Sequence, residues 1–272
     1  MPRSKPGTFA RMVVRRRFGQ HFLEPAWVEK VVRAIDPRPD ETFIEIGPGR
    51  GALTLPILDR AKAVVAFEID RDLASGLRRH AAPNLTVVEG DFLESDWLET
   101  HRSSSPLRVA GNLPYNVASP MLFKLVELYS AGHRLTDATL MLQREVAERL
   151  VAKPGTREYG VLSILIRHSA DVDRLLALPA GAFRPAPKVR SALLRLRFHA
   201  PNPRPRDQAT FVRLVQAIFT RRRKTLANAL CAFSGAPAAA SSVTLARAHI
   251  DGTRRPETLA IEELVALADL FR

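Results

Sequence analysis

Short apolar runs alternate with amphipathic stretches along most of this chain of 272 residues. Short apolar runs are typical of buried strands, and apolar residues at every third or fourth position are typical of helices. Pro25 to Ile35 has the helical spacing and a proline at its first position. This alternation predicts an α/β fold with a parallel sheet and helices on both of its faces. The predicted strands are Phe43–Ile46, Ala63–Ile69, Leu85–Val88, Leu107–Ala110, Ala138–Leu142 and Ala192–Leu196, and the helices between them are Ala52–Arg60, Arg71–His80, Ser119–Tyr129 and Arg144–Val151.

A proline-rich segment interrupts the alternation at residues 199–206, which read His-Ala-Pro-Asn-Pro-Arg-Pro-Arg. Beyond it, apolar residues return at helical spacing over Phe211–Phe219 and again over Leu259–Leu270. This change predicts a linker followed by a small helical domain. We therefore expect an N-terminal arm at residues 1–23, an α/β domain at 24–200 and a helical domain at 201–272.

Composition limits the class of protein further. Hydrophobic residues make up 46% of the chain and charged residues 25%, which is enough apolar material for a sizeable core and argues against disorder. The single cysteine, Cys231, excludes an internal disulfide and a multi-cysteine metal site, and favours a reducing compartment. The densest apolar window, Val161–Ile166, is only strand-length and far short of a membrane span. We expect a cytoplasmic protein that uses no metal and no membrane.

The net charge of +13 is concentrated at the two ends of the chain. Residues 1–23 carry six basic groups and no acid, and residues 201–272 carry 11 basic and six acidic groups. Such ends suit a polyanion, because neutralised phosphates release counterions. A second interpretation of the net charge is that it only keeps the protein soluble. The N-terminus, which has no acidic residue, also fits an organellar transit peptide.

A glycine-rich loop, Glu45-Ile-Gly-Pro-Gly-Arg-Gly51, lies between a predicted strand and helix. Glycines allow a tight turn and a close approach of a ligand to the backbone. Glu68 ends the next strand, where a carboxylate can accept hydrogen bonds from ribose hydroxyls, and Asp91 ends the third, where it can accept from an adenine amino group beside Phe92. Together these positions predict an adenosine-containing cofactor at the carboxyl edge of the sheet. The loop alone also fits a structural turn or a nicotinamide or flavin enzyme, and Arg50 is expected to face solvent.

The most specific motif follows the fourth strand and consists of Asn112, Leu113, Pro114 and Tyr115. The amino group of a nucleobase is a poor nucleophile and has to be positioned. An Asn oxygen and the backbone carbonyl beside Pro114 can accept its two N–H bonds, and Pro114 holds that carbonyl in place. Tyr115 offers a flat surface for stacking a base extruded from the RNA. The alternative is a purely structural role, in which the motif forms a turn and Tyr115 is a core residue.

From about Phe18 to its C-terminus, the sequence resembles the ribosomal RNA adenine dimethyltransferase family. The resemblance is carried by the glycine loop, Glu68 and the segments Phe18–Leu23, Gly90–Asp91, Asn112–Tyr115, Met141–Arg149 and Phe183–Val189. It implies a Rossmann-like class I methyltransferase domain followed by a small all-helical domain. It also implies methyl transfer from S-adenosylmethionine to N6 of two adjacent adenosines near the 3′ end of 16S rRNA in the small (30S) ribosomal subunit. Each adenosine would receive two methyl groups, as part of small-subunit biogenesis.

The resemblance also implies roles for individual residues of the cofactor site. His21 and Leu23 would contact the cofactor, Gly47 its methionine part, Glu68 its ribose and Asp91 its adenine. His21 stands where the family usually has asparagine, and a neutral imidazole can still donate or accept one hydrogen bond.

The remaining implied roles concern the RNA. Asn112 would lie between the methyl donor and the target base, and Tyr115 and Phe183 would stack on the two faces of that base. The bland alternative for Phe183 is a core residue before a structural loop. The basic run Arg221, Arg222, Arg223 and Lys224 is expected midway through a C-terminal helix, where it either contacts RNA phosphates or is a solvated surface.

We expect direct in-line displacement by a monomeric enzyme, with no covalent intermediate and no role for Cys231. Three alternatives stay open at this point. A resistance-type methyltransferase of large-subunit rRNA would share the motifs. A non-catalytic ribosome-assembly or organellar transcription factor could retain the fold, although the intact Asn112–Tyr115 motif argues against lost activity. A nucleotide-dependent oxidoreductase explains neither that motif nor the basic ends.

Overall fold

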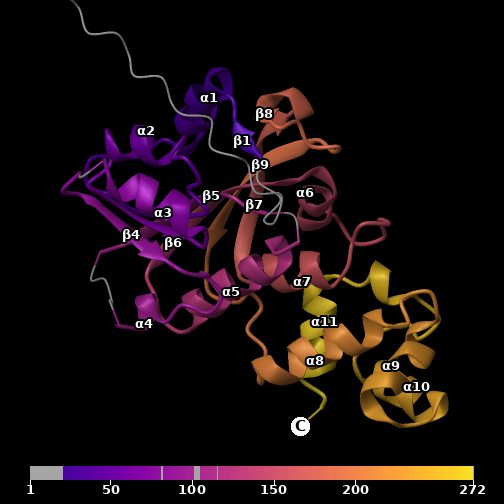
Figure 1. Ribbon diagram of the computed structural model, residues 1–272. Helices are drawn as coiled ribbons and strands as arrows, with labels where there is room; N and C mark the ends of the chain where they lie inside the picture. The colour runs from indigo at the N-terminus through magenta and orange to yellow at the C-terminus, as the bar shows by residue number, and fades with distance from the viewer. Residues whose placement is uncertain (1–20, 81, 101–104, 115, 272) are drawn as a thin grey trace, which may run out of the picture.

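The computed structural model describes residues 21–80, 82–100, 105–114 and 116–271. Within these ranges a seven-stranded sheet has the order β4-β3-β2-β5-β6-β9-β7 and forms the centre of the N-terminal part (Figure 1). Strands β4, β3, β2, β5 and β6 pair in parallel, and β9 is antiparallel to both β6 and β7. The strands are β2 (Thr42–Ile46), β3 (Ala63–Glu68), β4 (Leu85–Glu89), β5 (Leu107–Asn112), β6 (Leu135–Gln143), β7 (Ala170–Leu178) and β9 (Ser191–Phe198). The predicted mostly parallel α/β fold is confirmed.

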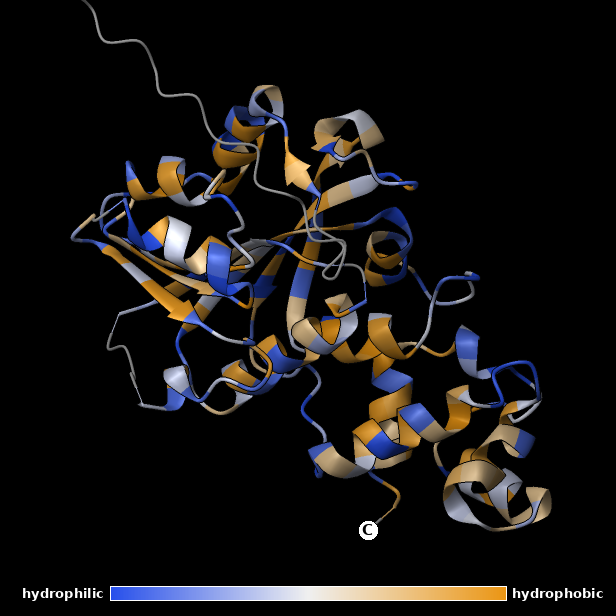
Figure 2. Cartoon of the chain, in the orientation of Figure 1, coloured by the Kyte–Doolittle hydropathy of each residue, from blue (hydrophilic) through white to orange (hydrophobic). Residues whose placement is uncertain are grey.

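Helices cover both faces of this sheet, as the alternation of side chains along the strands shows. Ile44 and Ile46 of β2 pack in one apolar cluster with α5, whereas Phe43 packs in another with α1 and α2. Figure 2 shows that the strands are largely apolar. The helices of this part are α1 (Pro25–Ile35), α2 (Thr54–Leu58), α3 (Arg71–Arg78), α4 (Trp97–Thr100), α5 (Ala118–Ser130), α6 (Arg144–Leu150) and α7 (Val161–Arg167).

The C-terminal part consists of helices in the described residues and lies beside the α/β part (Figure 1). Its helices are α8 (Gln208–Phe219), α9 (Leu226–Ser234), α10 (Ala238–Arg247) and α11 (Ile261–Ala268), and a short 3₁₀ helix spans Pro256–Thr258. Its apolar core also includes Tyr159, Ile164 and Leu165, which precede the linker. Side chains from both sides of the predicted domain boundary after residue 200 therefore pack in one apolar core. The boundary itself stays a prediction.

The strand-length apolar window at Val161–Ile166 is a helix, α7, in the structure. Several of its side chains are buried against either the sheet or the C-terminal helices, which explains its continuous apolar character. In the described residues, no single helix is long and apolar enough to cross a membrane, and α9 and α10 meet those criteria only as a pair bent by 102°.

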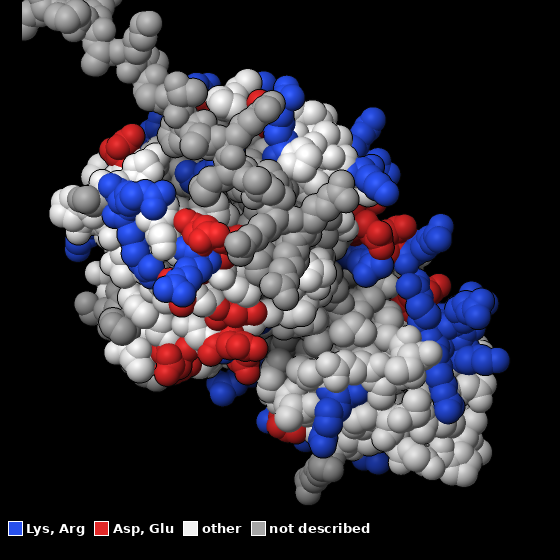
Figure 3. Space-filling view, viewed as in Figure 1, with Lys and Arg blue, Asp and Glu red and all other residues white. Residues whose placement is uncertain are grey.

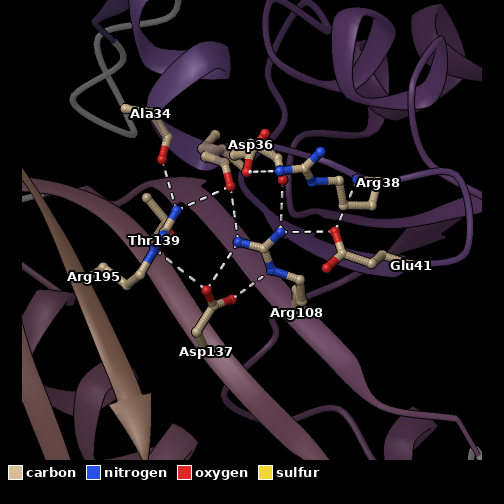
Figure 4. A network of polar contacts seen from close by, with 9 residues as sticks. Ala34, Asp36, Arg38, Glu41, Arg108, Asp137, Thr139 and Arg195 are labelled. Atoms are coloured by element: carbon tan, nitrogen blue, oxygen red, sulfur yellow. Dashed lines mark hydrogen bonds and ion pairs between the residues drawn. The ribbon is translucent and has the colours of Figure 1, made fainter.

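A small antiparallel pair lies apart from the main sheet and joins two distant segments. It consists of β1 (Phe22–Leu23) and β8 (Phe183–Arg184), and a 3₁₀ helix at Ala180–Ala182 precedes β8. Strand β1 leads directly into α1, whose far end is held to the sheet by a polar network around Arg108 (Figure 4). The position of α1 therefore helps to place residues 21–23, which also pair with β8.

Candidate active site

A cavity of about 580 Å³ opens at the carboxyl ends of β2, β3, β4 and β5. This volume is within the range of roughly 300–1,000 Å³ that is usual for small-molecule sites. Eight of the predicted site residues line it: His21, Leu23, Gly47, Glu68, Asp91, Asn112, Leu113 and Pro114. The structure thus brings together residues that are spread over more than ninety positions of the chain, because parallel strands end at one edge.

The glycine loop forms one wall of the cavity. Gly47 and Gly49 have φ angles of 69° and 60°, a region that side chains disfavour. The N–H of Gly47 donates to the carbonyl of Phe67 at 2.9 Å, which ties the loop to β3. A Cβ atom on Gly49 would lie 3.2 Å from the ring of Phe22, so glycine lets that ring pack closely on the loop.

Glu68 lies at the end of β3 with 4% of its surface exposed. Its carboxylate accepts hydrogen bonds from the backbone N–H groups of Gly49 and Asp70, both at 2.9 Å. Burial raises the pKa of Glu68, and these two N–H groups oppose the rise. The carboxylate is therefore held in one orientation at the cavity wall.

Asp91 lies one strand further along the same edge. Its Oδ1 accepts from the N–H of Leu93 at 2.9 Å, and the adjacent Phe92 is buried edge-on against Phe67 with ring centres 5.1 Å apart. Ile69 also lines the cavity and is 48% exposed. From the sequence, Ile69 was assigned only to a strand. Its place directly after Glu68, the predicted ribose acceptor, was the signal that it lies at the cofactor site.

Asn112 is the last residue of β5, and its side-chain Nδ2 donates to the backbone carbonyl of His21 at 2.8 Å. The N–H of Leu113 donates to the carbonyl of Met141 at 3.2 Å, and the Leu113 side chain is buried in the core. Pro114 follows on the cavity wall. Tyr115 lies outside the described residues, as do residues 1–20 of the predicted N-terminal arm.

Two residues near Asn112 and the glycine loop were missed by sequence reasoning. A Cβ atom on Gly111 would lie 2.6 Å from the backbone oxygen of Ile46, so β5 can pass β2 at this point only with glycine. Glu45 lines the cavity, is 2% exposed, and its Oε2 has no hydrogen-bond partner in the described part of the chain. The sequence does contain a signal for each of these residues, since Gly111 is a glycine inside a strand and Glu45 is an acidic residue in an apolar strand.

The structure does not bring Phe183 to the cavity. Phe183 lies in β8 opposite Leu23, is 2% exposed and packs in the apolar cluster that includes α1. This position agrees with the alternative interpretation of Phe183 as a core residue, and its predicted stacking on a base remains a proposal.

The basic run is not midway through a helix, and that prediction was wrong. Residues 221–224 form the turn between α8 and α9, where the N–H of Lys224 donates to the carbonyl of Arg221 at 2.8 Å. Arg222 makes an ion pair with Glu257 at 2.7 Å and donates to the carbonyl of Arg157. Arg221, Arg223 and Lys224 are exposed. Figure 3 shows Lys and Arg side chains gathered along the border between the α/β part and the C-terminal helices.

The cavity suits an adenosine-containing, positively charged cofactor. Its glycine wall permits close backbone approach, and Glu68, Asp91 and the unpartnered Glu45 oxygen are acceptors around it. In the described residues, no group of His, Cys, Asp and Glu could hold a metal ion. With an Asn-Leu-Pro segment beside such a cavity, fold and site define an S-adenosylmethionine-dependent methyltransferase. A family model described as ribosomal RNA adenine dimethylase matches residues 12–268. The chain belongs to this family and is an rRNA adenine N6,N6-dimethyltransferase.

Individual relatives support the same family. A protein named ribosomal RNA small subunit methyltransferase A from Acinetobacter baylyi is 44% identical over 259 residues, which cover 94% of this chain and 91% of that protein. A protein of the same name from Chromobacterium violaceum is 42% identical over 261 residues, covering 94% and 95%.

Solved structures give the same fold. The 23S rRNA methyltransferase ErmE is 26% identical with a TM-score of 0.67, over 92% of this chain and 98% of that one. A dimethyladenosine transferase from Plasmodium falciparum has a TM-score of 0.75 at 24% identity, over 91% and 96%.

Proposed function

We propose that this enzyme dimethylates N6 of two adjacent adenosines near the 3′ end of 16S rRNA, within the small ribosomal subunit in the cytoplasm. The identity of 44% to a small-subunit enzyme, against 26% to ErmE, favours the small over the large subunit. The observation that carries the chemistry is the Asn112 side chain on the wall of the cavity.

Each of several residues that line the cavity is assigned to one part of the cofactor. We assign Glu68 to the ribose, Asp91 to the adenine amino group and Gly47 to the methionine part, and His21 and Leu23 to further contacts with the cofactor. When bound, S-adenosylmethionine supplies a methyl group on a positively charged sulfur.

Catalysis in this proposal is positioning of the target amine. The Oδ1 of Asn112 accepts one N–H bond of the adenine amine, because its Nδ2 already donates to His21. The backbone carbonyl beside Pro114 accepts the other. The amine nitrogen then attacks in line, its new bond to the methyl carbon forms as the carbon–sulfur bond breaks, and the cationic nitrogen releases its proton to water. No covalent enzyme intermediate is needed.

Two further parts of the proposal concern how RNA is held. Tyr115 and Phe183 stack on the two faces of the base, for which the buried Phe183 side chain turns out of its apolar cluster while β8 stays paired with β1. Arg221, Arg223 and Lys224 contact phosphates as exposed cations at the turn, whereas Arg222 is committed to Glu257. The enzyme acts as a monomer.

The test is to map the methylated adenosines after incubating the enzyme and labelled S-adenosylmethionine with unmethylated small subunits and, separately, with large subunits. We expect two adjacent dimethylated adenosines near the 3′ end of the small-subunit RNA, and no label on large subunits. Asn112→Ala should lose at least about a hundredfold in kcat while cofactor affinity changes much less. Label on a large-subunit adenosine, or wild-type turnover by Asn112→Ala, would contradict the proposal.

A further inference from the structure

Residues His21, Phe22, Leu23 and Glu24 form a short segment, here named the strap, that is fastened to the 182–185 segment. Phe22 pairs with Arg184 and Leu23 with Phe183 in the β1–β8 ladder. The N–H of Glu24 donates to the carbonyl of Ala182 at 2.8 Å. At the other end, Nδ1 of His21 lies 2.7 Å from the carbonyl oxygen of Pro185. Because a carbonyl only accepts, the imidazole is the donor in this bond.

The strap also lies on the glycine loop of the cofactor site. The ring of Phe22 packs at the position of Gly49, where a Cβ atom would come within 3.2 Å of it. The guanidinium of Arg50 lies over the Phe22 ring, 4.5 Å from its centre. Arg50 is exposed, as expected from the sequence, but the expectation missed this contact. The strap is therefore in direct contact with the wall that binds the cofactor.

The strap makes a second contact with the reaction site through Asn112. The Nδ2 of Asn112 donates to the backbone carbonyl of His21 at 2.8 Å, across 91 positions of the chain. A carboxamide is planar, with its nitrogen and oxygen on opposite sides of the same carbon. A partner for the nitrogen therefore fixes the direction of the oxygen, which is the atom proposed to accept from the target amine.

We propose that His21 is a positioning residue for methyl transfer: its ring fastens the strap to Pro185, and its carbonyl sets the orientation of the Asn112 amide. The inference rests on the proposed role of Asn112. In this proposal the strap links the cofactor-binding loop to the position of the target amine. The same segment packs on the glycine loop and directs the Asn112 amide oxygen toward that amine. It also gives a physical reason for a residue that can donate at position 21, because either a histidine Nδ1–H or an asparagine Nδ2–H can reach a carbonyl whereas an aliphatic side chain cannot.

The first experiment compares His21→Leu with His21→Asn in steady-state kinetics and in direct binding of S-adenosylmethionine. Because His21 lines the cofactor cavity, His21→Leu should raise the cofactor Kd, and it should also lower kcat at saturating S-adenosylmethionine by roughly 10- to 100-fold. His21→Asn should restore kcat to within about threefold, because the amide keeps the donor. His199→Leu is the matched control: His199 Nδ1 also lies 2.7 Å from a carbonyl, that of Ala200, on an exposed segment away from the cavity. Its kcat should equal wild type.

The second experiment uses Asn112→Asp, which keeps an acceptor but places an oxygen against the His21 carbonyl. We expect hydrogen–deuterium exchange at the strap, read at the Glu24 amide, to become faster in Asn112→Asp and in His21→Leu, and to stay unchanged in His199→Leu.

The outcomes separate the inference from the proposed function. If Asn112→Ala keeps wild-type activity, the proposed function of Asn112 fails. If Asn112→Ala is inactive but His21→Leu has wild-type kcat, or only weakens cofactor binding, the positioning role alone fails. Failure of His21→Asn to restore kcat would also overturn it, because the ring would then be needed for something other than its donor.

Discussion

The Glu45 carboxyl lies in β2 beside the cofactor cavity, with 2% of the residue exposed. Burial penalises its charged form and raises the pKa of Glu45 to about 7, from an ordinary 4.5, and the nearby Glu68 carboxylate adds to the rise. The folded protein therefore binds this proton more tightly than the unfolded chain does. The stability that the protonated carboxyl contributes is fully present below about pH 4.5 and is lost as pH rises through about 7.

We expect Glu45→Gln to remove this pH dependence, because an amide does not ionise. At about 1.4 kcal/mol per pKa unit, the free energy of unfolding of the variant should gain up to about 3 kcal/mol on wild type between about pH 5 and pH 8. Urea unfolding of both proteins without cofactor at several pH values measures the difference, in which the titrating groups that do not interact with Glu45 cancel. Parallel stability curves for the two proteins would show that Glu45 titrates normally.

Gly111 is the second residue whose environment makes a definite prediction. A Cβ atom there would lie 2.6 Å from the backbone oxygen of Ile46, which cannot move without disturbing the sheet. We expect Gly111→Ala to cost about 1–3 kcal/mol, the usual range for overpacking, measured from the denaturation midpoint. Gly181→Ala is the control, since a Cβ atom there meets nothing within 4 Å. Equal midpoints for the two variants would contradict the prediction.

At the scale of elements, the turn between α8 and α9 carries two arginines in different environments. Arg222 is tied to Glu257 and to the carbonyl of Arg157, which joins the turn to a loop of the α/β part. Arg223 is exposed in the same turn. Arg223→Ala should therefore weaken binding to small subunits and lower the salt dependence by about one counterion without changing Tm. Arg222→Ala should lower Tm instead, and its salt dependence should stay near that of wild type. Binding titrations at several KCl concentrations, with thermal melts, distinguish the two, and reversed effects would contradict the assignment.

Local pattern identified most elements of the α/β part but not all of them. The helix at Pro25–Ile35 was predicted with its observed bounds, because its apolar face and first-position proline are local signals. The window at Val161–Ile166 has no polar face to reveal a helix, since it is packed between two cores. The two-residue strands β1 and β8 exist only because they pair across about 160 positions, which no local pattern can show.

At the scale of the molecule, the difference between local sequence signals and long-range packing explains which parts of the site were predictable. Glu68, Asp91 and Asn112 meet because each ends a parallel strand, and strand ends are readable from the sequence. The burial of Phe183 and the bond from Asn112 to the His21 carbonyl depend on how α1 lies over the sheet. The position of α1 is in turn a property of the assembled core.

The polar network that holds the far end of α1 centres on Arg108, which is 7% exposed (Figure 4). Its guanidinium pairs with Asp137 through two bonds of 2.9 Å and with Glu41 at 2.7 Å. It also donates to the carbonyl of Ile35 at 2.8 Å and to that of Asp36 at 3.0 Å, at the C-terminal end of the helix. One side chain thus joins β5, β6 and α1, and a cation at this end also complements the helix dipole.

Removing this cation should be costly because it leaves the buried Asp137 carboxylate and the partly exposed Glu41 carboxylate without their main partner. We expect Arg108→Met to lower the free energy of unfolding by about 3–5 kcal/mol, as is usual when one member of a buried ion pair is deleted. Arg108→Lys should recover only part of the loss, since an ammonium group cannot make the paired bonds to Asp137 and still reach both helix carbonyls. Adding Asp137→Leu to Arg108→Met should restore part of this loss, because the buried Asp137 charge is then gone while Glu41 keeps its own. Urea unfolding of the four proteins measures these values, and a loss below about 1 kcal/mol for Arg108→Met would mean that apolar packing alone holds α1 to the sheet.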